Sequence, residues 1–198
     1  MTKSSSKSST KSRCGWADKG DELYTKYHDE EWGSPIFDDN KLFEFIILES
    51  AQAGLSWITI LRRRENYRQA FANFDAKKIA KFDEAKITQL LQNEGIIRHR
   101  KKIISTINNA QKFLQTQKEF GTFKNYIWSF TNQKPLKNSW KNLSEIPPKT
   151  EISEKMCKDL KKRGFQFLGP TICYAFMQAT GMVNDHVTSC FRHNEIKG

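Results

Sequence analysis

Glu49 occupies a position at which a helix normally buries hydrocarbon. It lies in the segment LFEFIILESAQAGLSW, residues 42–57. With helical spacing, its side chain shares a face with Leu42, Phe45 and Ile46, so the carboxyl group is expected to lie in the protein interior. An unpaired, ionised carboxylate in an apolar interior costs several kcal/mol. The sequence therefore predicts that either another part of the fold or a ligand supplies a partner for Glu49.

A second group of residues that could do chemistry is the pair His186 and Cys190, which are four residues apart. On a helical turn this spacing puts both side chains on one face, where one zinc ion can contact both. Cys14 and His28 lie at the other end of the chain. If the four converge, they form a closed Cys2His2 site, which is structural rather than catalytic because no position is left open. Spacing alone favours buried thiols and hydrogen-bonded histidines, because only one of the two pairs has the spacing of metal ligands.

The segments that carry these side chains are predicted to be helical. Apolar residues recur at helical spacing along most of the chain, and no segment of strand length shows convincing alternation of apolar and polar residues. The predicted fold class is therefore all-α. Polar residues at 38–40, 75 and 83 are expected to cap helices. Helices are predicted over residues 23–32, 42 to a stop at Gly54, 66–74, 84–93, 97–116, 126–132, 151–163 and 171–180, with a polar loop over 133–148 and a final helical turn capped by Asn184 or Asp185.

The connection GIIRHR, residues 95–100, joins two of these helices through a short glycine-containing turn. Such a helical hairpin offers free backbone N–H groups at the start of its second helix, which suits one phosphate. Basic residues gather at this point. Helical hairpins are also common as plain packing units, and charge runs are usually solvated faces. The basic cluster consists of Arg98, His99, Arg100, Lys101 and Lys102.

Charge favours a polyanionic partner. Lys and Arg number 33 against 22 Asp and Glu, which gives a net charge of +11. An excess of this size is typical of proteins that bind nucleic acid, although it is also compatible with solubility alone. No apolar run approaches the roughly 18 residues of a membrane-spanning helix, so no membrane partner is expected.

The chain is predicted to form one domain behind a basic tail. Residues 1–13 contain only Ser, Thr, Lys and Arg after the initial Met, and we expect this segment to be disordered. Residues 14–198 have a length that one well-buried core accommodates. The four cysteines are scattered and no apolar secretory leader precedes them, so free thiols in the cytoplasm are expected.

Five blocks of the sequence match one family in the same order. They are CGW at 14–16, YHDEEWG at 27–33, LESAQAGLSWITILRRRENYR at 48–68, GIIRHR at 95–100 and GPTICYAFMQATGMVNDH at 169–186. On these blocks the sequence resembles the bacterial 3-methyladenine DNA glycosylase I family, within the helix-hairpin-helix glycosylase superfamily. The resemblance covers nearly everything from Cys14 to about Cys190.

The resemblance implies roles for particular residues. A structural zinc ion would join the N- and C-terminal segments, in a lobe formed by 14–35 and 150–198, through Cys14, His28, His186 and Cys190. A base pocket would be formed by Trp16, Tyr24, Tyr27, Glu49 and Trp57, with Trp32 close by. Gly54 and Leu55 would lie in the loop that fills the gap left by an extruded nucleotide. The DNA-binding hairpin, near 84–116, would use Gly95, Ile96, Ile97, Arg98, His99 and Arg100, with Lys101 adding a charge where the family pattern has glycine.

The resemblance also implies an activity. The expected protein is a monomeric, monofunctional enzyme that hydrolyses the N-glycosidic bond of 3-methyladenine in double-stranded alkylated DNA, releasing the base and leaving an abasic site. Glu49 would recognise the amino edge and the positive charge of the base. The region 126–135 offers no acid that could act as general base, and no hairpin lysine is assigned as a Schiff-base nucleophile, so no lyase activity is expected. Three alternatives remain: a non-catalytic zinc-stabilised DNA-binding module, a zinc hydrolase, and a glycosylase for another damaged base.

Overall fold

The computed structural model describes residues 11–17 and 20–196. Residues 1–10 of the predicted tail lie outside the described residues. At its other end, Ser12 and Arg13 contact the folded body: the Ser12 carbonyl accepts from Phe191 N at 2.9 Å, and Arg13 Nε donates to Asp29 Oδ1 at 2.9 Å.

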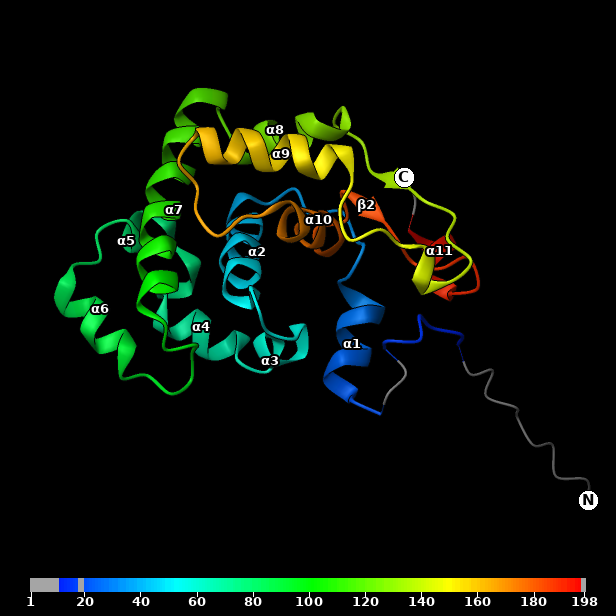
Figure 1. Cartoon of the computed structure of the whole chain (residues 1–198), viewed down its shortest axis with the longest axis horizontal. Helices are drawn as coiled ribbons and strands as arrows, with labels where there is room; N and C mark the ends of the chain where they lie inside the picture. The colour runs from blue at the N-terminus through cyan, green and yellow to red at the C-terminus, as the bar shows by residue number, and fades with distance from the viewer. Residues whose placement is uncertain (1–10, 18–19, 197–198) are drawn as a thin grey trace, which may run out of the picture.

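The described residues are mostly α-helical, as predicted from the apolar spacing (Figure 1). No helix in this part of the chain is both long and apolar enough to cross a membrane. The helices are α1 Glu22–Glu30, α2 Asp39–Gln52, α3 Trp57–Leu61, α4 Arg64–Ala70, α5 Ala76–Ile79, α6 Glu84–Leu91, α7 Arg100–Phe120, α8 Phe123–Trp128, α9 Glu151–Lys162, α10 Pro170–Ala179 and α11 Phe191–Glu195; short 3-10 helices span Ala72–Phe74, Ser129–Thr131 and Leu143–Glu145; the strands are β1 Leu136–Lys137 and β2 Val183–Asn184.

Helix α2 forms the centre of the fold. It lies beside α10 in the middle of Figure 1, with α7 on one side and α3 below. Every residue from Leu42 to Ala51 is buried, which confirms that this helix is interior on nearly all sides. Its N-terminus is closed by Asp38, whose carboxylate accepts from Lys41 N at 2.8 Å. Burial of apolar surface around α2, at about 25 cal/mol per Å², is the main force that holds the surrounding helices in place.

Two further predicted caps are confirmed. Asp75 accepts from Lys77 N at 2.9 Å at the start of α5, and Asp83 accepts from Lys86 N at 2.9 Å at the start of α6. Each carboxylate satisfies a backbone N–H group that has no partner within its own helix. The sequence therefore located these helix starts correctly.

Other helix boundaries were predicted wrongly. Helix α7 begins at Arg100 rather than at residue 97, because His99 is extended (φ −129°, ψ 107°) and its Nδ1 atom accepts from Lys102 N at 3.3 Å. Helix α8 begins at Phe123 rather than at residue 126, because Thr122 caps it and Asp39 of α2 accepts from Phe123 N at 2.8 Å. In both cases a side chain or a distant helix decides the boundary.

The predicted helical turn after Asn184 is also wrong. Val183 and Asn184 form strand β2, which pairs in parallel with β1 in the segment predicted to be a polar loop, with Leu136 opposite Val183. After β2 the chain remains non-helical until α11 begins at Phe191. The Asn184 side chain accepts from His186 N at 3.2 Å, an Asx-type turn that replaces the predicted helical start.

Candidate functional site

A cavity of about 370 Å³ lies between α1, α2, α3 and α10. All six residues that were predicted to form a base pocket line it. The long connection before α9 supplies two apolar residues to its wall, and α10 supplies Ala175 and Gln178. The complete lining is Trp16, Tyr24, Tyr27, Trp32, Glu49, Gln52, Trp57, Leu143, Ile146, Ala175 and Gln178.

Aromatic rings dominate the wall of this cavity. Trp16 packs against Tyr24 with 4.7 Å between ring centroids and meets Trp32 edge-on at 5.1 Å. Tyr27 lies 5.5 Å from Trp57. The segment that carries Trp16 is fastened to α1, because Thr25 Oγ1 donates to Ala17 O at 2.8 Å. Contacts of this kind suit a flat, polarisable ligand that can lie against ring faces.

Glu49 is the acid of the cavity. Glu49 is 2% exposed, and its Oε2 atom has no hydrogen-bond partner in the described part of the chain. Burial raises the pKa of this carboxyl group to about 8. Burial is the cause of this rise, and no charged group among the described residues offsets it. The predicted burial of Glu49 is therefore confirmed, and the described part of the chain supplies no partner for its Oε2 atom.

Two other polar atoms beside Glu49 are buried without partners among the described residues. They are Oε1 of Gln52, which follows Glu49 by about one helical turn on α2, and Nε1 of Trp57 at the start of α3. Buried polar groups are almost always hydrogen-bonded, so unsatisfied ones that line a cavity indicate where a ligand binds. The cavity thus offers a carboxylate, an amide oxygen and an indole N–H group.

Gln178 was missed by the sequence analysis. Its Nε2 atom donates to Asp185 Oδ2 at 2.8 Å. The carboxylate of Asp185 is fully buried and also accepts from Trp140 Nε1 at 2.8 Å and from the hydroxyl of Tyr174. This arrangement joins α10 to the loop that supplies Leu143 to the cavity. Because Asp185 meets its partners only through tertiary contacts, no local sequence pattern indicates it.

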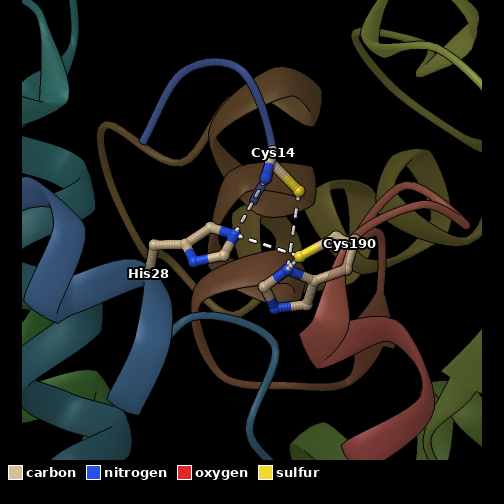
Figure 2. A group of neighbouring side chains, drawn as sticks. Cys14, His28 and Cys190 are labelled. Carbon is tan, nitrogen blue, oxygen red and sulfur yellow. Dashed lines mark hydrogen bonds between the residues drawn. The ribbon is translucent and has the colours of Figure 1, made fainter. Parts of the chain in front are cut away.

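The four predicted metal ligands converge in one buried cluster. Their potential ligand atoms all lie within 4.8 Å of one another. Cys190 Sγ is 3.4 Å from His28 Nε2 and 3.4 Å from His186 Nδ1, and Cys14 Sγ is 3.5 Å from His186 Nδ1. Figure 2 shows the labelled side chains turned toward a common centre from separate segments of the chain.

These distances match the donor set of a tetrahedral metal site. With ligand bonds of about 2.0–2.3 Å, neighbouring ligand atoms of a tetrahedron lie roughly 3.3–3.8 Å apart. Hydrogen bonds from Cys14 and from the two histidines lower the pKa of Cys190, which favours the thiolate that a metal requires. The cluster could therefore hold a metal ion.

The outer ring nitrogens of both histidines are also fixed. His28 Nδ1 lies 2.8 Å from Asp29 Oδ1, and Arg13 pairs with the same carboxylate at 2.8 Å. His186 Nε2 lies 3.0 Å from the carbonyl oxygen of Trp32. Metal-binding histidines usually donate their second N–H group to a carboxylate or carbonyl in this way. Because Trp32 also lines the cavity, the cluster is physically connected to its wall.

The predicted hairpin connects α6 to α7 and is anchored by α4. Ile96 is buried, and Ile97 N donates to the hydroxyl of Tyr67 at 3.2 Å. A Cβ atom on Gly95 would lie 2.8 Å from the side chain of Asn66, so glycine permits this close approach. The loop backbone is therefore held against the body of the protein.

The charged residues of the hairpin point outward, with one exception. Arg98 and Arg100 are exposed and pair with Glu94 and Glu84 at 3.4 and 2.7 Å, respectively. His99 and Lys101 are exposed as well. Exposed pairs contribute at most about 1 kcal/mol, so these cations remain available to a stronger partner.

Lys102 is the exception, because its side chain turns toward the end of α2. Its ammonium group donates to the carbonyl oxygens of Ala51 and Ala53 at 2.8 and 2.7 Å. The turn after Ala53 carries the two predicted gap-filling residues. Gly54 has φ +82°, and Leu55 is 39% exposed at the tip.

A second helical hairpin, α9 and α10, lies beside the first. Its loop presents Phe167, which is exposed, has φ +57° and lies 6.5 Å from the ring of His99. Asn109 fixes the loop by exchanging two hydrogen bonds with the backbone of Gln166, at 2.8 and 3.0 Å. A bulky residue held at positive φ is often functional. The contact between Phe167 and His99 joins segments far apart in the chain, so no local sequence pattern indicates it.

Comparison with solved structures places this arrangement in a known class. A crystal structure of 3-methyladenine DNA glycosylase I superposes with a TM-score of 0.88 and 51% sequence identity, covering 91% of this chain and 98% of that one. A variant of 3-methyladenine DNA glycosylase I in complex with 3-methyladenine gives a TM-score of 0.87 at 36% identity, covering 90% and 96% of the two chains. The fold is therefore that of a DNA glycosylase.

Sequence comparison defines the family. The DNA-3-methyladenine glycosylase 1 of Escherichia coli (strain K12) is 53% identical over 178 residues, which cover 90% of this chain and 95% of that protein. The methyladenine glycosylase family model matches residues 16–193. This chain belongs to the methyladenine glycosylase family.

Proposed function

We propose that this protein is a DNA-3-methyladenine glycosylase, which hydrolyses the N-glycosidic bond of 3-methyladenine in alkylated double-stranded DNA and leaves an abasic site. The observation that carries this proposal is the unpaired carboxyl group of Glu49, buried in a cavity of aromatic rings. Membership of the family and relatives of that name at more than half identity support it.

Recognition rests on the charge of the damaged base. Methylation at N3 gives adenine a positive charge, whereas normal bases are neutral. A desolvated cation over an aromatic face gains about 2 kcal/mol, and base stacking gains roughly 1–3 kcal/mol. A cationic base beside Glu49 also lowers the pKa of its carboxyl group from about 8, so that the carboxylate forms as the lesion binds. Trp16, Tyr24, Tyr27, Trp57 and Trp32 form the stacking walls.

The base reaches this cavity only when its nucleotide leaves the duplex. Extrusion costs a few kcal/mol. We assign Gly54 and Leu55 to filling the gap, because Leu55 is exposed at the tip of the turn that adjoins the cavity. We assign α6, α7 and their connection as the helix-hairpin-helix element that binds the DNA backbone through residues 95–101. The neighbouring loop with Phe167 extends the same contact surface.

Bond cleavage needs little acid catalysis, because an alkylated adenine is already a good leaving group. The sugar develops oxocarbenium character and is attacked by water. Glu49 is the one acid among the described residues that line the cavity. We assign it to recognition of the amino edge and to electrostatic stabilisation of the departing base and the sugar cation. No lysine is assigned as a nucleophile, so the protein hydrolyses the bond without cleaving the strand.

We propose that the cluster of Cys14, His28, His186 and Cys190 holds one structural zinc ion. When bound, zinc supplies a crosslink between the N-terminal segment and the segment before α11, and four protein ligands leave no position for catalysis. The fit of the ligand distances and the fixed outer nitrogens support this assignment. The crosslink makes residues 14–198 one domain.

The proposal also includes the cellular compartment and the oligomeric state. The four cysteines are free and buried, which suits a reducing environment. We therefore place the protein in the cytoplasm, where it acts as a monomer on duplex DNA.

A lesion-release assay tests the function. Purified protein is incubated with methylated duplex DNA, and released bases are separated chromatographically. We expect free 3-methyladenine to appear, with release of 7-methylguanine, and of hypoxanthine from a separate deoxyinosine-containing duplex, near background. Glu49→Gln should bind DNA but lose most of the release, since the amide cannot stabilise a cation. Binding without release by the wild type would identify a non-catalytic module, and preferential release of another base would identify a different lesion specificity.

A further inference from the structure

Lys102 joins the DNA-binding hairpin to the helix that carries Glu49. Its Nζ atom donates to Ala51 O at 2.8 Å and to Ala53 O at 2.7 Å. These carbonyls lie at the C-terminal end of α2, where the last backbone acceptors have no partner within the helix. A cation at this position also interacts favourably with the negative end of the helix dipole. Lys102 therefore closes the end of α2 from a different helix.

Both ends of the Lys102 residue are fixed. Its backbone N–H group donates to His99 Nδ1 at 3.3 Å, and its carbonyl accepts from Ser105 Oγ at 2.8 Å and from Thr106 Oγ1 at 3.0 Å. The side chain is half-buried, and burial lowers the pKa of its ammonium group. The ammonium group donates to two carbonyl oxygens, so it does not extend toward solvent as a phosphate contact does.

The two elements that Lys102 joins perform different parts of the proposed reaction. The connection before α7 contacts the DNA backbone, whereas the end of α2 carries Gln52 in the cavity and continues into the turn with Leu55. Residues 54–56 of that turn are exposed. Leu55 N donates to Gln52 O at 2.6 Å, but a Cβ atom on Gly54 would have no neighbour within 4 Å.

We infer that Lys102 is a positioning residue that couples the backbone contacts of the hairpin to extrusion of the nucleotide. This inference rests on the proposed function and explains how its two parts act together. Inserting Leu55 into the duplex is opposed by base stacking and pairing. If the turn were free to shift relative to the hairpin, phosphate binding would hold the DNA but the tip would retreat instead of displacing the base. The ammonium group of Lys102 prevents this retreat by holding Ala51 and Ala53.

The inference is tested with Lys102→Met, which keeps the length of the stem but removes the ammonium group. We expect single-turnover release of 3-methyladenine from methylated duplex DNA, at saturating enzyme, to fall roughly tenfold to a hundredfold, as small misplacements of functional groups do. Affinity for free 3-methyladenine, followed by tryptophan fluorescence, should stay within about twofold. The slope of log affinity for undamaged duplex against log salt should not change, because no phosphate contact is lost.

Two further variants separate this role from others. Lys102→Arg retains a cation and should restore part of the release rate. Lys101→Met removes a neighbouring exposed charge and should lower the salt slope by about 0.9, with release recovering at high enzyme concentration.

Three results would overturn the inference. Loss of free-base binding in Lys102→Met would show general damage to the cavity, and a reduced salt slope would make Lys102 a phosphate contact. Unchanged release at saturating enzyme would show that the bond to α2 has no role in extrusion. Failure of the wild-type protein to release the base would instead refute the proposed function, and the coupling inference would fall with it.

Discussion

Glu44 and Glu49 both lie on the buried helix α2, but the pKa values of their carboxyl groups are shifted in opposite directions. Burial alone would raise the pKa of Glu44, yet the charge and hydrogen bond of Arg64 lower it. Arg68 and Lys41 pair with the same carboxylate at 2.9 and 3.1 Å. No cation among the described residues pairs with Glu49, and burial raises its pKa to about 8. The first acid is satisfied by the fold, whereas the second is left for a ligand.

Replacing Glu49 with Gln should stabilise the free protein, and the gain should increase with pH. The folded state holds a proton up to about pH 8, whereas the unfolded state releases it near the ordinary value of 4.5. Stability of the wild type therefore falls as pH rises between these values. The free energy of unfolding of Glu49→Gln minus that of the wild type should grow by about 3 kcal/mol between pH 5 and pH 8. Urea denaturation at both pH values measures it, and a pH-independent difference would contradict the burial of an unpaired acid.

Glu44→Gln is the matched control and should have the opposite effect. A carboxyl group with a lowered pKa stabilises the fold above its ordinary pKa and loses that contribution as pH falls. Removing it leaves the buried guanidinium of Arg64 with fewer partners. We expect the free energy of unfolding to fall by about 3 kcal/mol at pH 7 and by less at pH 3. Urea denaturation at these two pH values checks the direction.

Removing a ligand of the metal cluster should reduce stability more than activity. Wild-type protein is expected to contain one zinc ion per chain by elemental analysis. Cys190→Ser should lose the metal and lower the melting temperature by about 10 °C or more, because structural zinc contributes strongly to folding. Cys157→Ser, a buried thiol outside the cluster, should retain the metal. If the folded fraction of Cys190→Ser releases no base at low temperature, the metal has a catalytic role instead.

Asp29 should raise the affinity of the cluster for zinc without binding the metal itself. Its carboxylate lies 2.8 Å from His28 Nδ1 and is held by Arg13. Loss of such a partner typically lowers metal affinity about 10- to 100-fold. We therefore expect Asp29→Asn to release zinc at lower chelator concentrations than the wild type. Glu30→Gln, an exposed neighbour, serves as the control, and equal retention in both variants would exclude this role.

Sequence patterns located the features that depend on short stretches of chain. The caps at Asp38, Asp75 and Asp83 follow from residues within one turn, and the anomaly at Glu49 follows from helical spacing along α2. The pair His186 and Cys190 was correctly placed in one cluster but for the wrong reason. The two side chains meet across an extended segment and a turn, not on a helical face.

The missed features depend on contacts between distant segments. Lys102 was grouped with exposed basic residues because the sequence does not show that the end of α2 lies within reach of its ammonium group. The bond between Gln178 and Asp185 was missed for the same reason, since a strand and a turn separate α10 from Asp185. Tertiary packing, rather than residue type, decides which polar side chains serve the site.

Arg100→Ala should weaken binding to damaged and undamaged duplexes alike. Arg100 is exposed and pairs with Glu84 at 2.7 Å, a bond too weak to prevent it from contacting a phosphate. Loss of one phosphate contact should lower the slope of log affinity against log salt by about 0.9 while leaving thermal stability nearly unchanged. Glu84→Gln, which frees Arg100, should strengthen binding slightly and serves as the matched control. Fluorescence anisotropy over a salt series measures both variants, and a loss confined to damaged DNA would instead assign Arg100 to recognition of the lesion.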